Sequence, residues 1–316
     1  MSIQLAYTED FSIGLKRLMI NECNTALDYL KKSDTMDEKH KAVHETRKAF
    51  KKIRGCLRLV RDHIEYYKKE NAWFRDLGRE ISGIRDRTAN IETLNVLLEQ
   101  YDSQLYEKSF NVLEDELQQD REKVAKKVFR EENRLEKIRK SVEKKIKAIS
   151  GWPIDIKTFD DIRPSIKRTY KRGRKGLQNS KKNGGVEDLH EWRKRGKYLR
   201  YQLDVLNRLW PQMFETLEDE LHDITNFTGT FKDLHNLHLA IKQLGEPFTD
   251  ETEKLLFNAI VEKHRRLMKE HALMKGEKFY FDTPGDFCDR IELYWNIHQQ
   301  EISNGIIVQP KKLEHT

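Results

Sequence analysis

Residues 43–61 read VHETRKAFKKIRGCLRLVR, and residues 189–208 read LHEWRKRGKYLRYQLDVLNR. At a shift of 146 residues, the second stretch repeats six charged or polar positions of the first: His44 with His190, Glu45 with Glu191, Arg47 with Arg193, Lys48 with Lys194, Lys51 with Lys197 and Arg54 with Arg200. A repeat inside one chain indicates two structural units of the same kind. Because most repeated positions are cationic, we expect the two units to face one shared polyanionic ligand.

Helical geometry turns each stretch into a cationic face. Successive helical residues lie about 100° apart, so the cations of each stretch fall on one side and its apolar residues on the other. We call these faces the first basic stripe (His44, Arg47, Lys48, Lys51, Arg54, Arg58) and the second basic stripe (His190, Arg193, Lys194, Lys197, Arg200, Arg208). Asp204 stands where the first copy has Arg58, so we expect the second stripe to be weaker at its far end.

The chemistry of the stripes points to phosphate. Arginine offers a fork for two phosphate oxygens, lysine a mobile point charge, and histidine a donor whose charge can rise beside an anion. Cations in line repel one another unless something anionic covers them, and we expect Glu45 and Glu191 to lie off the stripes and compensate little. A single basic helix is usually a solvated surface, but two matched copies favour a binding site.

Two further segments add candidate contacts. Ile84-Arg85-Asp86 matches Phe231-Lys232-Asp233 at a shift of 147, and each carboxylate could hold a neighbouring cation in place, although a simple ion pair at a helix end would look the same. The run SIKRTYKRGRKGL at 165–177 carries six cations, of which Arg168, Arg172 and Lys175 are our candidates together with Arg85 and Lys232.

Composition bounds the class of protein. The 316 residues are 37% hydrophobic and 36% charged, which is typical of a helix-rich protein with solvated faces. The net charge is only +7, so basicity here is a matter of placement. Three scattered cysteines form no disulfide framework, and no apolar stretch approaches 18 residues. We therefore expect a cytoplasmic protein with no membrane span, no secretory signal, no metal and no cofactor.

Hydrophobic periodicity predicts an all-α fold without useful strands. In the first half we expect helices at 9–32, 38–69, 70–82, 91–106 and 107–149. In the second half we expect them at 165–177, 186–209, 214–244 (interrupted near 228–230), 249–275 and 284–300, with a loop at 179–185. The predicted organisation is a first unit at 1–150, a linker at 151–164, a second unit at 165–303 and a loose tail at 304–316.

The doubled pattern H-x-x-R-K-x-x-K-x-x-R, present at 44–54 and 190–200, resembles the hallmark of the conserved histidine α-helical domain (CHAD) family. The resemblance covers about residues 10–300. It implies two antiparallel four-helix bundles related by pseudo-twofold symmetry around a basic central channel. It also implies binding of inorganic polyphosphate without catalysis, often at polyphosphate granules. Asp204, Lys232 in place of arginine, and the acidic helix at 107–149 depart from the pattern.

Two other functions compete with this one. RNA or DNA binding calls for aromatic residues interleaved with the cations for base stacking, and the stripes carry only Tyr201, which disfavours it. A metal-dependent phosphohydrolase could use His222-Asp223 with His235 and His238, but no further metal ligands can be identified from the sequence.

Overall fold

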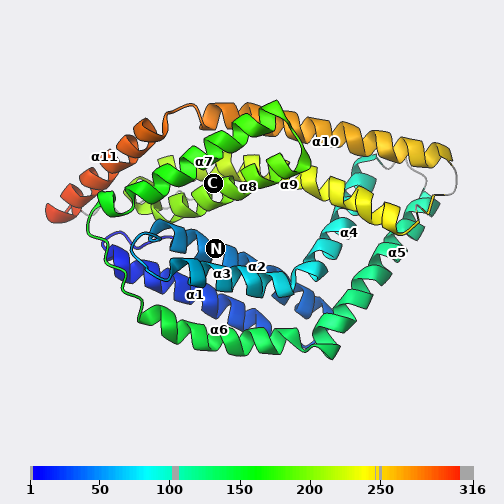
Figure 1. Cartoon of the computed structure of the whole chain (residues 1–316), viewed down its shortest axis with the longest axis horizontal. Coiled ribbons are helices and arrows are strands. Elements are labelled where there is room, and N and C mark those ends of the chain that lie inside the picture. Colours follow the sequence, from blue (N-terminus) through cyan, green and yellow to red (C-terminus); the bar gives the residue numbers. More distant parts are fainter. Residues whose placement is uncertain (1–2, 102–106, 246, 249–250, 307–316) are drawn as a thin grey trace, which may run out of the picture.

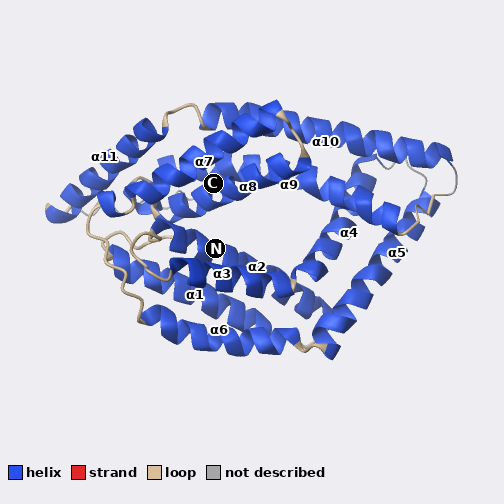
Figure 2. Cartoon of the chain, viewed as in Figure 1, coloured by secondary structure: helices blue, strands red, loops and turns tan. Residues whose placement is uncertain are grey.

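The computed structural model describes residues 3–101, 107–245, 247–248 and 251–306. Within these ranges the chain forms eleven α-helices and no strand, which confirms the all-α prediction (Figures 1 and 2). None of these helices is both long enough and apolar enough to cross a lipid bilayer.

In the described part of the first half, the chain forms seven helical elements. They are α1 (Phe11–Lys31), α2 (Met36–Leu59), α3 (Tyr67–Glu80), α4 (Ser82–Tyr101), α5 (Glu107–Lys126), the π-helical turn η2 (Lys127–Glu131) and α6 (Arg134–Ser150). Helix α2 begins at a capping box in which Thr35 and Glu38 satisfy each other's backbone N–H groups. The prediction of one helix over 38–69 is wrong, because the chain turns after Leu59 and buries Ile64 in the core before α3 begins.

The predicted long helix at 107–149 is also interrupted. Helix α5 passes into η2, and Asn133 then adopts a left-handed conformation (φ 48°), which asparagine tolerates better than most residues. The reversal lets α6 run back and pack against α1 (Figure 1).

The second half contains α7 (Arg163–Lys182), α8 (Val186–Val205), α9 (Pro211–Gln243), α10 (Glu251–Phe279) and α11 (Pro284–Ser303), with 3₁₀ turns η3 (Phe159–Asp161) and η4 (Asn207–Leu209). Helix α7 takes up most of the predicted loop at 179–185, and the chain turns at Gly184 (φ 66°). The interruption predicted near 228–230 is absent, since α9 runs through it unbroken. Of the predicted tail, residues 307–316 lie outside the described residues.

Two hydrophobic cores hold the helices together, and each draws on both halves of the chain. The larger contains Phe50 of α2 and Trp192 of α8, both almost fully buried. The smaller joins Leu94 of α4 and Leu113 of α5 to Leu237 of α9 and Val261 of α10. Helices α4 and α5 therefore pack on the second half, although they belong to the first in sequence.

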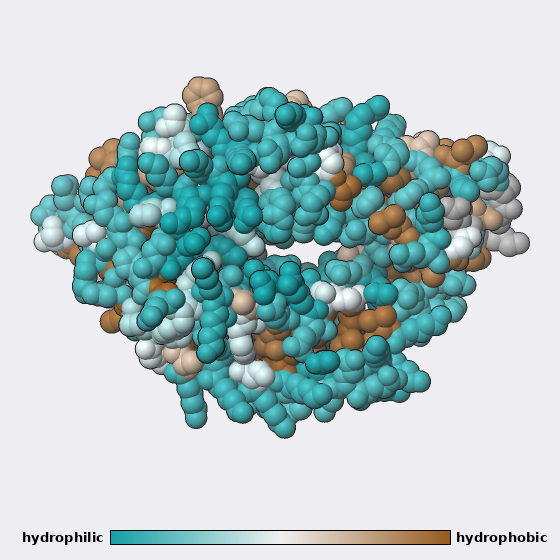
Figure 3. Space-filling view, in the orientation of Figure 1, coloured by the Kyte–Doolittle hydropathy of each residue, from teal (hydrophilic) through white to brown (hydrophobic). Residues whose placement is uncertain are grey.

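The space-filling view shows an opening through the molecule, with a mostly hydrophilic rim (Figure 3). In the same orientation, α2 and α3 lie on one side of this opening, α8 and α9 on the other, and α4 at its end (Figure 1). The first basic stripe lies on α2 and the second on α8, except for Arg208, which lies in η4.

Candidate functional site

Helices α2 and α8 meet at equivalent positions of the repeat. A Cβ atom on Gly55 would lie 2.5 Å from Cβ of Tyr201, the residue 146 positions later. Only glycine allows this approach, because any added Cβ atom would clash with Tyr201.

The crossing brings lysines of the two stripes together. Burial, followed by the charges of Arg47 and Arg193, lowers the pKa of Lys51 to about 7. Burial, Arg193 and Lys51 likewise lower the pKa of Lys197 well below its usual range. Lys51 and Lys197 are again 146 residues apart. The fold thus places cations of both stripes close enough to repel one another.

Arg47 and Arg193 are held by equivalent hydrogen bonds. Arg47 Nη1 donates to the Gly78 carbonyl oxygen at 2.7 Å, and Arg193 Nε donates to that of Thr225 at 2.9 Å. The two acceptors are 147 residues apart, the shift of the second repeated segment. A Cβ atom on Gly229 would lie 2.8 Å from Arg193 Nε, so this glycine makes room for the guanidinium and does not break α9.

The repeated histidines lie beside the cations of the second segment. Burial and Arg85 lower the pKa of His44, and burial and Lys232 lower that of His190 to about 4. Lys232 Nζ lies 3.3 Å from His190 Nδ1. Both histidines are therefore mainly neutral at pH 7 in the free protein.

The carboxylates of the second segment act as expected on the stripe arginines. Asp86 favours the charged form of Arg47 and Asp233 that of Arg193, although burial lowers the pKa of both arginines overall. Arg85 itself forms an ion pair with Glu92 at 2.8 Å.

The glutamates of the repeat correct one expectation. Glu45 Oε2 lies 3.3 Å from Lys48 Nζ, and Glu191 pairs with both Lys194 and Arg195. The i,i+3 and i,i+4 spacings place these groups side by side on the helix surface. The glutamates therefore do compensate charge at the outer edge of each stripe.

The far end of the second stripe serves a structural purpose. Arg208 is buried in η4 and donates to the Ala6 carbonyl oxygen at 2.9 Å, and Asp204 accepts from the Ile3 N–H at 2.8 Å. Both residues fasten the N-terminal segment, so placing Arg208 on an exposed stripe was wrong. The cations of the second stripe on α8 therefore end at Arg200.

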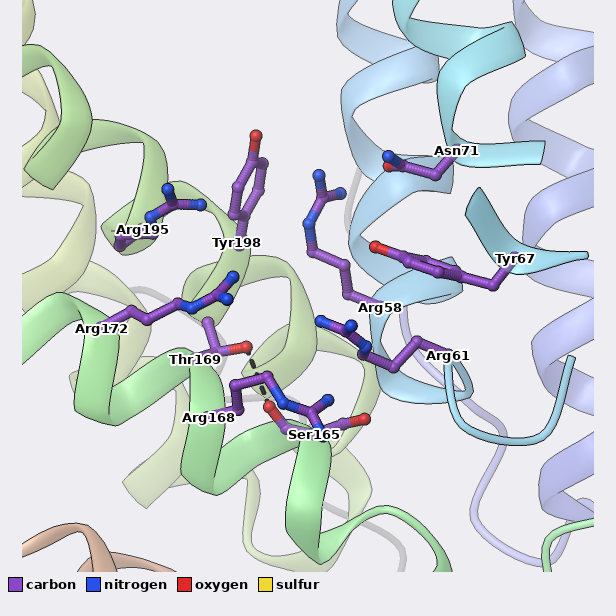
Figure 4. A pocket seen from close by; sticks show the side chains of 10 residues that line it. All are labelled: Arg58, Arg61, Tyr67, Asn71, Ser165, Arg168, Thr169, Arg172, Arg195 and Tyr198. Carbon is purple, nitrogen blue, oxygen red and sulfur yellow. Dashed lines mark hydrogen bonds between the residues drawn. The ribbon is translucent and has the colours of Figure 1, made fainter. Parts of the chain in front are cut away.

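At the far end of the first stripe, the cations continue into a cavity of about 210 Å³ (Figure 4). We call it the arginine cavity. Its lining residues come from α2, α3, α7, α8 and the α2–α3 turn: Arg58, Arg61, Tyr67, Asn71, Ser165, Arg168, Thr169, Arg172, Arg195 and Tyr198. The second half of the chain thus supplies one wall and the first half the other.

Three of the residues that line this cavity were candidate contacts in the sequence, although the cavity itself was not predicted. Arg58, Arg168 and Arg172 line it as candidate residues, while Lys175 lies further along α7 and is exposed. Arg61 and Arg195 were missed. Arg61 lies three residues after Arg58, a spacing that would place it on the same face if the helix continued. However, α2 ends at Leu59, so Arg61 lies beyond the helix.

The aromatic residues near the cations also differ from expectation. Tyr201 is buried against Gly55, and Tyr198 and Tyr67 lie among the arginines instead. The guanidinium carbon of Arg58 lies 3.6 Å from the centre of the Tyr198 ring. Arg54 Nε donates to Asn71 Oδ1 at 3.2 Å, which joins the stripe to the cavity wall.

The residues proposed for a phosphohydrolase have other partners. Arg200 Nη1 lies 2.6 Å from His222 Nδ1, and Asp223 forms an ion pair with Lys275 at 2.9 Å. Among the residues that the structure describes, no three His, Cys, Asp or Glu side chains are grouped to hold a metal ion.

The fold and the site define an all-α protein in which two repeated basic helices cross and bring their cationic side chains close together. Residues 19–242 match the CHAD domain family, and because this is more than half of the chain, the protein belongs to that family. The match is shorter than the expected 10–300, and α10 and α11 lie beyond it. No curated protein matches the chain.

Proposed function

We propose that this protein binds inorganic polyphosphate, or another linear polyanion, and does not catalyse a reaction on it. The observation that carries the proposal is the approach of Lys51 and Lys197 at the crossing of α2 and α8. Their lowered pKa values reflect burial and repulsion by neighbouring cations of both stripes in the free protein. A polyanion beside these side chains would offset the repulsion and restore their charge.

In this proposal the phosphate chain follows the two stripes through a basic channel at the opening seen in Figure 3. Two helical units, 1–150 and 165–303, would contribute to it by pseudo-twofold symmetry. The matched contacts of Gly55 with Tyr201 and of Arg47 and Arg193 with backbone carbonyls support that symmetry. The proposed contacts are His44, Arg47, Lys48, Lys51, Arg54, Arg58, Arg85, Arg168, Arg172, Lys175, His190, Arg193, Lys194, Lys197, Arg200 and Lys232. We expect this binding to occur in the cytoplasm, at polyphosphate granules.

Nucleic acid is the competing ligand. Binding of single strands uses open aromatic faces on which bases stack. Arg58 covers one face of Tyr198, and Arg61 lies 5.1 Å from the Tyr67 ring centre, so the tyrosines near the cations are already occupied by guanidinium groups. This arrangement favours a ligand that carries charge but no bases.

A competition experiment tests the proposal. Labelled long-chain polyphosphate is bound to the full chain at moderate salt and displaced with unlabelled polyphosphate or single-stranded RNA at equal phosphate concentration. We expect RNA to displace the label at least about tenfold less effectively, since it matches the charge but not the spacing of the phosphates. Equal displacement by RNA would contradict the proposal, as would failure of polyphosphate to bind.

A further inference from the structure

The arginine cavity differs from the rest of the basic surface because its cations converge from several directions. Arg58 and Arg61 approach from the first half of the chain, and Arg168, Arg172 and Arg195 from the second (Figure 4). Burial, Arg195, Arg61 and Arg168 lower the pKa of Arg172. Such convergence suits one compact anion held from several sides better than an extended chain lying along a surface.

The size of the cavity sets the size of the group that fits. Since a water molecule takes about 30 Å³ of liquid volume, a cavity of about 210 Å³ holds a group of one or two phosphoryl units. A long chain segment would not fit inside. The hydroxyls of Ser165 and Thr169 and the amide of Asn71 add polar partners to the arginine forks.

The end of a phosphate chain differs chemically from its interior. A terminal phosphoryl group has three non-bridging oxygens and carries close to two charges near neutral pH, as a phosphate monoester does. An internal unit has two such oxygens and one charge. Several guanidinium forks in one place therefore match a terminus better, because each fork takes two oxygens.

We propose that the arginine cavity binds the terminal phosphoryl group of an inorganic phosphate chain and so fixes one end of the polyanion. This inference rests on the proposed function and deepens it by assigning the chain end to one place. Arg54 of the first basic stripe donates a hydrogen bond to Asn71 of the cavity wall and so connects the stripe to the arginine cavity.

The tyrosines of the cavity favour an inorganic chain over a nucleotide, whose phosphate chain also has an end. Arg58 and Arg195 both lie near the Tyr198 ring, at 3.6 and 5.9 Å from its centre, and Arg61 lies near that of Tyr67. A base would have to displace these cations in order to stack. We therefore expect the adenosine of ATP to add nothing to binding.

Asp62 supplies an internal counter-charge at the cavity. Its Oδ2 lies 3.1 Å from Arg168 Nη1 and 3.4 Å from Ser165 Oγ, and its Oδ1 lies 3.6 Å from Arg61 Nε. An incoming phosphoryl group competes with this carboxylate for the same donors. Removing its charge should strengthen binding of a chain end.

The test compares pyrophosphate, which has two ends, with cyclic trimetaphosphate, which has none but carries a similar charge at neutral pH. Dissociation constants for the full chain are measured by calorimetry at fixed ionic strength. We expect pyrophosphate to bind more tightly. Arg172→Gln should weaken pyrophosphate about tenfold and leave trimetaphosphate unchanged, while Asp62→Asn should strengthen pyrophosphate about threefold. Arg266→Gln on α10, an exposed arginine away from the cavity, is the matched control.

The outcomes separate this inference from the proposed function. If trimetaphosphate binds as tightly as pyrophosphate, or if Arg172→Gln weakens both alike, the cavity does not recognise a chain end, whatever long-chain polyphosphate does. Tighter binding of ATP than of tripolyphosphate would overturn the assignment to an inorganic chain. Long-chain binding that depends on Lys51 and Lys197 but not on Arg172 would leave the proposed function intact and remove the chain-end site.

Discussion

Lys51 and Lys197 are the residues at which folding and the proposed binding make the most clearly opposed demands. Each is partly buried beside other cations, and neither has its ordinary pKa in the free protein. Neutral side chains of similar length would pack at the same positions without the repulsion. A lysine that weakens the fold but holds an anion is typical of a functional site.

We therefore expect Lys51→Gln/Lys197→Gln to be more stable than the natural chain at pH 7, by on the order of 1–2 kcal/mol. The sign follows from the lowered pKa: between about 7 and 10.5 the folded protein binds fewer protons than the unfolded chain, so its stability rises with pH. The advantage of the variant should thus shrink as pH increases from 7 to 9.5.

Urea unfolding of both proteins across this pH range measures the difference. Burial raises the pKa of Glu218 to about 8, so its contribution to stability falls as pH rises. Because Glu218 is present in both proteins, this contribution cancels when their free energies of unfolding are subtracted. Lys147→Gln/Lys278→Gln, two exposed lysines on α6 and α10, should show no such trend. A destabilised Lys51→Gln/Lys197→Gln protein would show that these lysines are not held in repulsion.

Residue spacing predicted which cations share a helix face, apart from Arg208, but not which groups those cations meet across the fold. Helical periodicity places Lys51 and Arg47 on one face, yet nothing in it says that this face meets Lys197 and Arg193. The i,i+3 and i,i+4 neighbours Glu45 and Glu191 were open to prediction and were misjudged. The tether of Arg208 to Ala6 depends on contacts across the fold, which local spacing cannot supply.

Among the elements, the crossing of α2 and α8 depends on the absence of a side chain at Gly55. Helix propensity alone predicts that Gly55→Ala stabilises α2 by up to about 1 kcal/mol. Because the added Cβ would lie 2.5 Å from Cβ of Tyr201, we expect a net loss of about 1–3 kcal/mol instead.

Gly83→Ala is the matched control, since its Cβ would meet nothing closer than 3.7 Å within a helix. Urea unfolding should show Gly83→Ala neutral or stabilised and Gly55→Ala destabilised. If Gly55→Ala is as stable as the natural chain, the helices do not depend on this close approach.

Several helix boundaries could not be predicted from local sequence patterns. Neither 60–66 nor 127–133 contains a glycine or a proline, so nothing in the sequence pattern interrupted the continuous helices predicted there. Helix α2 ends because the chain turns to bury Ile64 in the core. The left-handed conformation of Asn133 reverses the chain before α6. At Gly229 the opposite error arose, because glycine in a helix can mark a close contact as well as a break.

Over the whole molecule, residues from both halves of the chain form the hydrophobic cores and line the arginine cavity. Leu94 of the first half packs with Leu237 of the second, and the arginine cavity has one wall from each. The repeat predicted two related units around a common ligand, but the packing of α4 and α5 on the second half depends on long-range contacts that no sequence period reveals. A site made by both halves should bind through both.

The salt dependence of polyphosphate binding tests this most directly. Affinity is measured from low to moderate salt for the natural chain, for Lys51→Gln and Lys197→Gln singly and together, and for Lys147→Gln/Lys278→Gln. Each lost contact should reduce the slope of log affinity against log salt by about 0.7, hence by about 1.4 for the double variant, if polyphosphate behaves as a single strand does. The control should keep the natural slope. Equal slopes and affinities for all variants would contradict the account.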